Sequence, residues 1–239
     1  MSESPPPVLE KHHRDVQGGA ARAAVFGVSD GLVSNVAIVL GFAGANTAAG
    51  LVRLAGLAGL IGGAVSMAAG EYISMKAQSE LLERELEMER VELRRSPEAE
   101  RRELAQIYRS RGVDEATADQ LARALHRDPE LALQTHAREE LGIDPESLGR
   151  PVSAAASSFV TFSIGASIPL APYFFGTGTA ALVTAVLLGV IAALTVGALL
   201  ARFTGRPVLR SAARQLLFSA IPAAITFALG SAVGVGGIA

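Results

Sequence analysis

Five apolar stretches long enough to cross a membrane dominate this sequence, and a strongly charged segment separates the second from the third. A membrane-spanning helix needs about 20 mainly apolar residues. The mean hydropathy of +0.36 is too high for an ordinary soluble domain. We therefore expect an all-α membrane protein with five transmembrane helices, at about residues 20–45, 54–75, 152–175, 180–201 and 212–238.

The charged segment divides the chain into four parts. We expect a polar N-terminal segment (1–19), transmembrane helices 1 and 2 (20–75), a helical insert (76–150) and transmembrane helices 3 to 5 (151–239). Pro169 and Pro172 are expected to bend or break the third span, and Pro222 to kink the fifth. The N-terminal segment has no apolar core of the kind found in a cleavable signal peptide.

Basic residues predict the orientation of the spans, because cytoplasmic loops are enriched in Lys and Arg. They precede the first span, flank the insert and fill the link between the fourth and fifth spans, whereas the opposite side has only Arg53. This asymmetry places the N-terminus and the insert in the cytoplasm and the C-terminus outside. The membrane we expect is the inner membrane of a bacterial cell.

The insert has 13 Lys or Arg and 18 Asp or Glu, and its pattern is helical throughout. Strong helix formers predict that the second span continues as one helix to about residue 95. Leucines with helical spacing give the later helices an apolar face, so we expect a small folded domain. Helix starts are predicted at Ser96-Pro97, Asp114 and Asp128-Pro129, and a helix end at Gly142.

Two acidic residues lie in the first two spans. Asp30 is deep in the first, where an ionisable side chain is costly and indicates function by default. Glu71 is near the cytoplasmic end of the second, in one stripe with Met67 and Met75. Carboxylate and thioether groups suit a divalent transition metal. Alternatively, Glu71 reaches to the interface and the methionines only pack. The Gly59-x-x-x-Gly63 pattern predicts a close helix contact, with a dimer interface as one possibility.

Glutamates three or four residues apart form a second candidate site in the insert. A tight turn at Ser96-Pro97 brings Glu89 and Glu92 opposite Glu100 and Glu103, and such carboxylates repel each other unless cations lie between them. His136 lies one turn before Glu140 and adds an imidazole. The alternative is a solvated charged helix with arginine partners. Because the chain has no cysteine, thiolate metal sites and disulfides are excluded.

Several of these motifs together resemble the vacuolar iron transporter family, from about His13 onward. In the spans the resemblance rests on Asp30-Gly31-Leu32-Val33 and Gly63-Ala64-Val65-Ser66-Met67. In the insert it rests on Glu89-x-x-Glu92, Glu100-x-x-Glu103 and Glu140-Leu141-Gly142.

The resemblance implies a homodimer with a path between its subunits and a cytoplasmic three-helix metal-binding domain. It implies export of Fe²⁺ from the cytosol, coupled to inward proton movement. It also implies that Asp30 and Met67 act in the membrane, and that the metal ligands of the insert are Glu89, Glu92, Glu100, Glu103 and Glu140.

The chain departs from that family pattern at two places. Gly59 stands where plant and fungal members have a glutamate, and Glu71, one turn after Met67, is similar to the nodulin-like branch. His136-Ala137 replaces a Met-Met pair. These differences leave open whether Glu71 takes over the missing carboxylate, and they add Mn²⁺, Zn²⁺ and Co²⁺ to Fe²⁺ as candidate substrates.

The expected partners are the lipid bilayer, divalent metal ions, protons and a second copy of the chain, with no nucleic acid and no prosthetic group. One alternative function is a non-transporting, metal-responsive membrane protein that signals through its dimer. An enzyme is not expected, because the sequence has no HExxH, GxSxG or phosphate-binding loop and no cysteine nucleophile.

Overall fold

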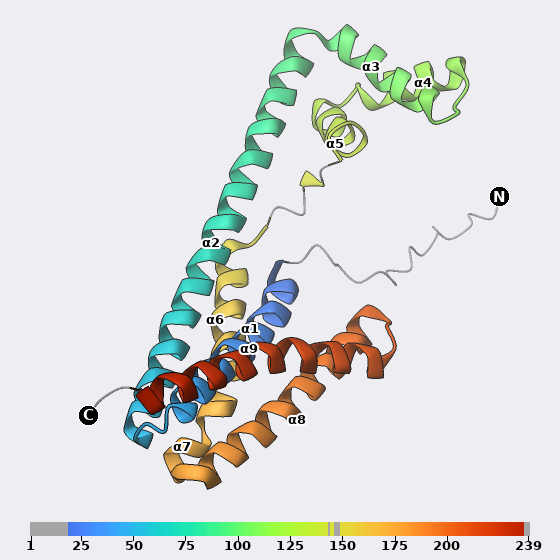
Figure 1. Cartoon of the computed structure of the whole chain (residues 1–239). Helices are drawn as coiled ribbons and strands as arrows, with labels where there is room; N and C mark the ends of the chain where they lie inside the picture. Colours follow the sequence, from blue (N-terminus) through green and yellow to red (C-terminus); the bar gives the residue numbers. More distant parts are fainter. Residues whose placement is uncertain (1–18, 143, 146–148, 237–239) are drawn as a thin grey trace, which may run out of the picture.

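The computed structural model describes residues 19–142, 144–145 and 149–236, and these are almost entirely helical (Figure 1). All but the last residue of the predicted N-terminal segment (1–19) and the end of the predicted fifth span lie outside the described residues, and Gly19 is the first residue of α1. The helices are α1 (Gly19–Gly44), α2 (Ala49–Arg95), α3 (Pro97–Ser110), α4 (Glu115–Leu125), α5 (Pro129–Glu139), α6 (Pro151–Leu170), α7 (Pro172–Phe175), α8 (Gly178–Thr204) and α9 (Val208–Gly236).

Among these, α1, α2, α6, α8 and α9 are long and apolar enough to cross a membrane, as the sequence predicts. Their large exposed apolar side chains, such as Leu54, Ile61 and Leu229, suit a lipid environment. The all-helical fold and its five candidate spans are therefore confirmed, and the chain is an integral membrane protein.

Helix α1 is the centre of the bundle, because α2, α6, α8 and α9 all pack against it. Its closest approach is to α6: a Cβ built on Gly31 meets the backbone carbonyl of Phe162, and one built on Gly165 meets that of Val28. Only glycine permits two backbones this close, as small residues commonly do at helix contacts in membranes. The glycine of the Asp30-Gly31 motif therefore fixes how α1 and α6 pack.

The glycines of α2 also make contacts within the chain. A Cβ on Gly56 meets Leu170, one on Gly59 meets Ile38, and one on Gly63 meets Phe162. The close helix contact predicted from the Gly59-x-x-x-Gly63 pattern is thus a contact of α2 with α1 and α6. Gly62, one position away, has no heavy atom within 4 Å of its built Cβ among the described residues.

Helix α2 has 47 residues and runs without a break from the membrane bundle into the insert. At about 1.5 Å per residue it is about 70 Å long, roughly twice the length of a membrane span. Figure 1 shows it leaving the bundle and carrying α3, α4 and α5 at its far end. The predicted continuation of the second span to residue 95 is correct.

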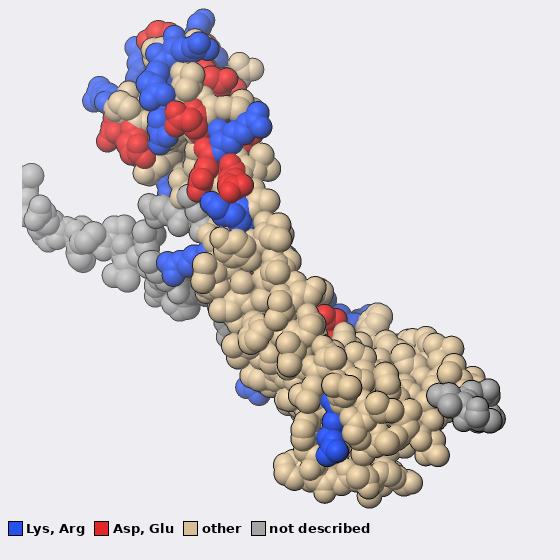
Figure 2. Space-filling view, turned by 90° about the vertical axis from the view of Figure 1, so that its left-hand side faces the viewer, with Lys and Arg blue, Asp and Glu red and all other residues tan. Residues whose placement is uncertain are grey.

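Charge separates the two ends of the molecule. In Figure 2 the Lys, Arg, Asp and Glu side chains crowd the insert end, and the span end is mostly uncharged. The insert has its own small core, in which Leu104 and Ala105 of α3 pack against Ala118 and Ala122 of α4.

The predicted helix boundaries are mostly correct. Asp114 caps α4 by accepting a hydrogen bond from the Thr117 backbone N–H, and Asp128 caps α5 in the same manner. Ser96 does precede α3 with Pro97 in the first turn, but its side chain makes no capping hydrogen bond. The third span ends at Leu170 and a separate turn, α7, follows, so the prolines break this span as predicted.

Candidate metal centre

The turn at Ser96 and the packing of α5 against α2 bring three helices together at the far end of α2. The end of α2 supplies Glu89, the start of α3 supplies Glu100 and the end of α5 supplies His136. One ligand atom from each of these three side chains lies within 4.8 Å of the others, and all three residues are buried. Buried acids are rare unless they are paired or bind a cation, so this cluster is the first candidate metal site.

His136 is the centre of the cluster and is fully buried. Its Nδ1 lies 3.0 Å from Oε1 of Glu89 and 3.1 Å from Oε2 of Glu140. A single Nδ1 proton points at only one carboxylate, and here Glu140 makes the hydrogen bond. Within the described part of the chain, Glu89 Oε1 and His136 Nε2 are buried without a hydrogen-bond partner.

Burial and crowding of negative charge change the pKa values at this site. Burial, then the charges of Glu89 and Glu103, raises the pKa of Glu100. Burial also raises the pKa of Glu140, although the hydrogen bond from His136 opposes it. For His136, burial alone lowers the pKa, but the carboxylates of Glu89 and Glu140 outweigh it and the net pKa is raised. The site thus favours any cation that neutralises the carboxylates.

The remaining predicted glutamates of the insert lie at the edge of the cluster. Glu92 and Glu103 are solvent-exposed, and neither belongs to the buried group. Both are still close enough for their negative charges to raise the pKa of Glu100. The Glu140 side chain is 30% exposed, so it connects the buried histidine to the surface. We call these three exposed or partly exposed acids the outer acids; their negative charge lies close to the buried ligands.

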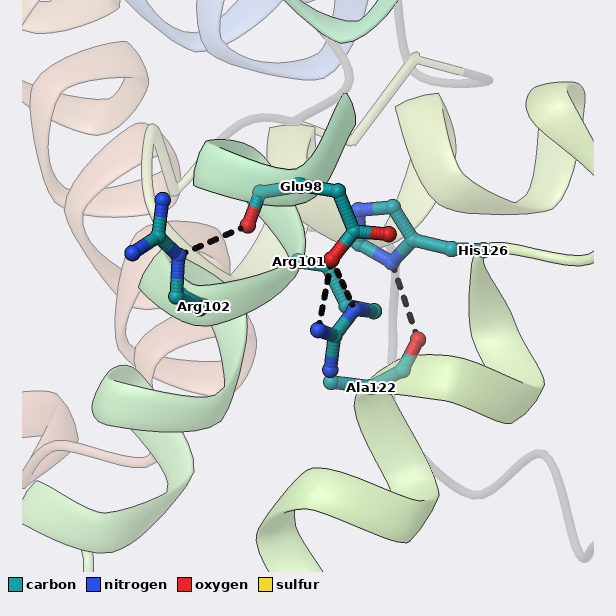
Figure 3. Close-up of polar contacts among 5 residues, drawn as sticks. All are labelled: Glu98, Arg101, Arg102, Ala122 and His126. Carbon is teal, nitrogen blue, oxygen red and sulfur yellow. Dashed lines mark hydrogen bonds and ion pairs between the residues drawn. The ribbon is translucent and has the colours of Figure 1, made fainter. Parts of the chain in front are cut away.

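A second histidine lies beside the first. The rings of His126 and His136 meet edge to face, with centroids 5.3 Å apart. Figure 3 shows His126 Nδ1 directed at the carbonyl oxygen of Ala122, 2.9 Å away, next to the ion pair of Arg101 with Glu98. Burial lowers the pKa of His126, and its Nδ1 is the donor in this contact because a carbonyl oxygen can only accept. It packs against the candidate ligand.

In the membrane bundle, each predicted residue has a different neighbour. Asp30 is half-buried and accepts a hydrogen bond of 3.3 Å from the Ser34 hydroxyl. Met67 packs against the apolar cluster around Phe162. Glu71 is paired with Arg22 of α1, with 2.8 Å between Oε1 and Nη2. Glu71 therefore has a cationic partner that its own stripe on α2 does not reveal.

The buried cluster has the donor set of a divalent transition-metal site. Ligand bonds of about 2.1 Å at right angles put neighbouring donor atoms about 3 Å apart. The separations of His136 Nδ1 from Glu89 and Glu140, which are hydrogen-bond distances, are also short enough for these atoms to be neighbouring ligands of one ion. Imidazole with carboxylates suits Fe²⁺, Mn²⁺, Co²⁺ or Zn²⁺ better than Ca²⁺, which takes oxygen ligands only.

Comparison with known proteins decides the family. The model of the VIT family matches residues 21–231, which covers the membrane helices and the insert. The chain belongs to the VIT family. A vacuolar iron transporter of Acanthamoeba castellanii is 39% identical over 197 residues, which cover 79% of this chain and 72% of the relative. Vacuolar iron transporter 1 of Oryza sativa subsp. japonica is 32% identical over 77% of this chain and 74% of its own length.

A third relative, vacuolar iron transporter 1 of Arabidopsis thaliana, is 33% identical over 69% of this chain and 65% of its own length. The resemblance predicted from the sequence motifs is thus confirmed. Membership of the VIT family supports transport of metal ions and gives no support to an enzyme.

Two features of the sites could not be found from the motifs. Of the five motif glutamates, the structure buries Glu89 and Glu100 with His136, whereas Glu92, Glu103 and Glu140 are exposed or partly exposed. His136 itself is among the ligands predicted from the sequence, from its position one turn before Glu140; which of the acids are buried with it is not. The pairing of Glu71 with Arg22 joins residues 49 positions apart, and no local pattern predicts it.

Proposed function

We propose that this VIT-family protein exports Fe²⁺, and also Mn²⁺, from the cytosol in exchange for protons. The observation that carries this proposal is the buried group Glu89, Glu100 and His136, which lies on a helix continuous with a membrane span. The family membership supports metal transport, and the ligand chemistry supports a first-row divalent ion.

In this proposal the insert is a cytoplasmic collecting domain. The outer acids Glu92, Glu103 and Glu140 attract a hydrated cation, and the buried ligands then replace part of its water shell. The raised pKa values of Glu100 and Glu140 support the step, because a bound metal ion relieves the repulsion between the carboxylates.

The membrane step would use Asp30, Met67 and Glu71. A carboxylate inside the bilayer alternates between a proton and a metal ion, since each neutralises it. Asp30 is within reach of the Ser34 hydroxyl, which supports a polar path along α1. In this proposal Glu71 replaces the glutamate that plant and fungal members have at the position of Gly59.

A homodimer with the metal path between subunits completes the proposal. The membrane-spanning window of α2 is only 17% buried inside the single chain. Built Cβ atoms at Gly62 and Gly70 meet no described heavy atom within 4 Å, so this face of α2 is open for close helix packing. The proposed location is a bacterial inner membrane with the insert on the cytoplasmic side.

The test is transport by the full-length protein in liposomes with a pH-sensitive dye inside. We expect Fe²⁺ and Mn²⁺ to enter vesicles that contain correctly oriented protein while protons leave. Asp30→Asn should abolish both fluxes and leave folding intact, whereas Asp119→Asn, on α4 outside the spans, should leave both unchanged. Unchanged Fe²⁺ flux in Asp30→Asn would contradict the mechanism.

The alternative is a metal-responsive membrane protein that does not transport. The unbroken α2 favours this alternative, because a change of position at Glu89 on metal binding is transmitted along one continuous helix to the membrane bundle. It predicts metal binding by the full-length protein with no flux of metal or protons, and the same liposome experiment separates the two functions.

A further inference from the structure

The C-terminal part of the chain has positive charge and no negative charge of its own. Between residues 151 and 239 the sequence contains four arginines and no Asp, Glu or Lys. The arginines are Arg202, Arg206, Arg210 and Arg214, spaced every fourth residue across the link from α8 to α9. All four are exposed, and no ion pair joins any of them to a described residue.

Close packing of α8 against α9 gathers these arginines at one end of a hairpin. A Cβ built on Gly197 meets the Ala212 backbone at 2.6 Å, so the two helices cross closely just before the link. Arg202 follows that crossing by five residues, about 7.5 Å along α8, and Arg210 precedes Ala212 by two residues. Gly205 turns the chain between them in the left-handed conformation, with φ of 65°.

The link lies at a membrane surface, because it joins two consecutive spans. Helix α8 has 27 residues and is about 40 Å long, which exceeds the roughly 30 Å of the hydrocarbon core. Its last turn therefore reaches the headgroup layer. The apolar side chains beside the arginines are also exposed, with Leu209 83% and Val208 50% accessible. Arginines and apolar side chains together suit the boundary between headgroups and acyl chains.

We propose that the link between α8 and α9 is a binding surface for the phosphate headgroups of anionic phospholipids, formed by Arg202, Arg206, Arg210 and Arg214. Guanidinium groups bind phosphate oxygens in pairs of parallel hydrogen bonds. Clusters of four or more basic residues at the end of a span attract anionic lipid, each contributing about 1 kcal/mol. Zwitterionic lipid lacks the net charge that unpaired arginines require.

The experiment measures lipid retained by the purified full-length protein, by native mass spectrometry in detergent. We expect phosphatidylglycerol adducts to outnumber phosphatidylcholine adducts at equal lipid concentration. Arg210→Gln with Arg214→Gln should weaken phosphatidylglycerol binding by about fivefold for each arginine removed. Replacing all four by Gln should remove the preference, and replacing all four by Lys should keep most of it.

The matched control removes the same charge from the insert. Arg84, Arg95, Arg123 and Arg127 are also arginines without an ion pair to a described residue, and their change to Gln should leave lipid binding unchanged. Equal retention of the two lipids by the natural sequence, or unchanged preference after loss of all four link arginines, would show that these residues act only on membrane orientation. Displacement of the lipid by inorganic phosphate would indicate a site for free anions and would also contradict the proposal.

Discussion

His136 Nδ1 and Glu89 Oε1 lie 3.0 Å apart, and the two side chains are 0% and 3% exposed. A buried, ionised carboxylate such as that of Glu89 costs several kcal/mol unless a proton, a charged partner or a metal ion neutralises it. Glu100 adds a third buried donor atom to the pair. A divalent cation between these donor atoms would neutralise the carboxylates.

Glu100→Gln is expected to stabilise the metal-free protein by about 1 kcal/mol while weakening metal binding at least tenfold. Burial raises the pKa of Glu100, so its ionised form destabilises the fold at neutral pH and a neutral amide removes that cost. Thermal unfolding and metal titration of the full-length protein measure the two effects. Glu83→Gln, an exposed change on α2, serves as control and should alter neither. Lower stability in the metal-free Glu100→Gln protein would contradict this account.

Metal affinity is expected to fall as the pH is lowered from neutral towards about 5. Glu100, Glu140 and His136 all have raised pKa values, so each takes up its proton at a higher pH than usual and competes with the metal. The loss should begin above the ordinary histidine pKa of about 6.5 and amount to about tenfold per pH unit for each proton displaced. Titrations of Mn²⁺ at several pH values measure the slope. An affinity independent of pH between 7 and 5 is incompatible with these ligands.

Arg22 is expected to compete with transported cations for Glu71, because its guanidinium lies 2.8 Å from the carboxylate. The Arg22 side chain is 68% exposed, and such pairs contribute at most about 1 kcal/mol. Arg22→Gln should therefore cost little stability and lower the apparent KM for Fe²⁺ by up to about fivefold. Arg22→Lys keeps the charge and should behave like the natural sequence. A raised or unchanged KM in Arg22→Gln would argue against Glu71 as a metal-binding residue of the path.

Gly31→Ala is expected to destabilise the protein by about 1–3 kcal/mol, because the new Cβ would meet the Phe162 carbonyl of α6. The same change at Gly62, whose built Cβ has no described neighbour within 4 Å, should cost less, because no described atom of the same chain stands in its way. Thermal unfolding in detergent compares the two. Equal effects at both positions would show that the contact between α1 and α6 does not limit stability.

The membrane helices could be predicted from sequence because their signal is local: each needs only a run of apolar residues of sufficient length. Helix starts at Asp114 and Asp128 were equally local, since a side chain caps a backbone group two or three residues away. Ser96 shows the limit of such patterns, because the abrupt turn into α3 places its hydroxyl away from any capping bond.

The candidate site was predicted only in part, for a physical reason. Spacing along α2 and α3 placed Glu89 and Glu100 on facing helices, but burial depends on how α5 packs against α2. That packing is long-range, and it brings a ligand atom of His136 within 4.8 Å of both carboxylates while Glu92 and Glu103 stay exposed. Sequence periodicity does not distinguish the buried acids from the exposed ones on the same helices.

The central claim is that His136 and its neighbouring glutamates bind one divalent metal ion. Pulsed electron paramagnetic resonance of the full-length protein with Mn²⁺ as probe tests it directly, since it detects a nitrogen atom bonded to the metal. We expect an imidazole nitrogen coupling that persists in His126→Ala and disappears in His136→Ala. Bound Mn²⁺ without nitrogen coupling, or with coupling unchanged in His136→Ala, would contradict the proposed site.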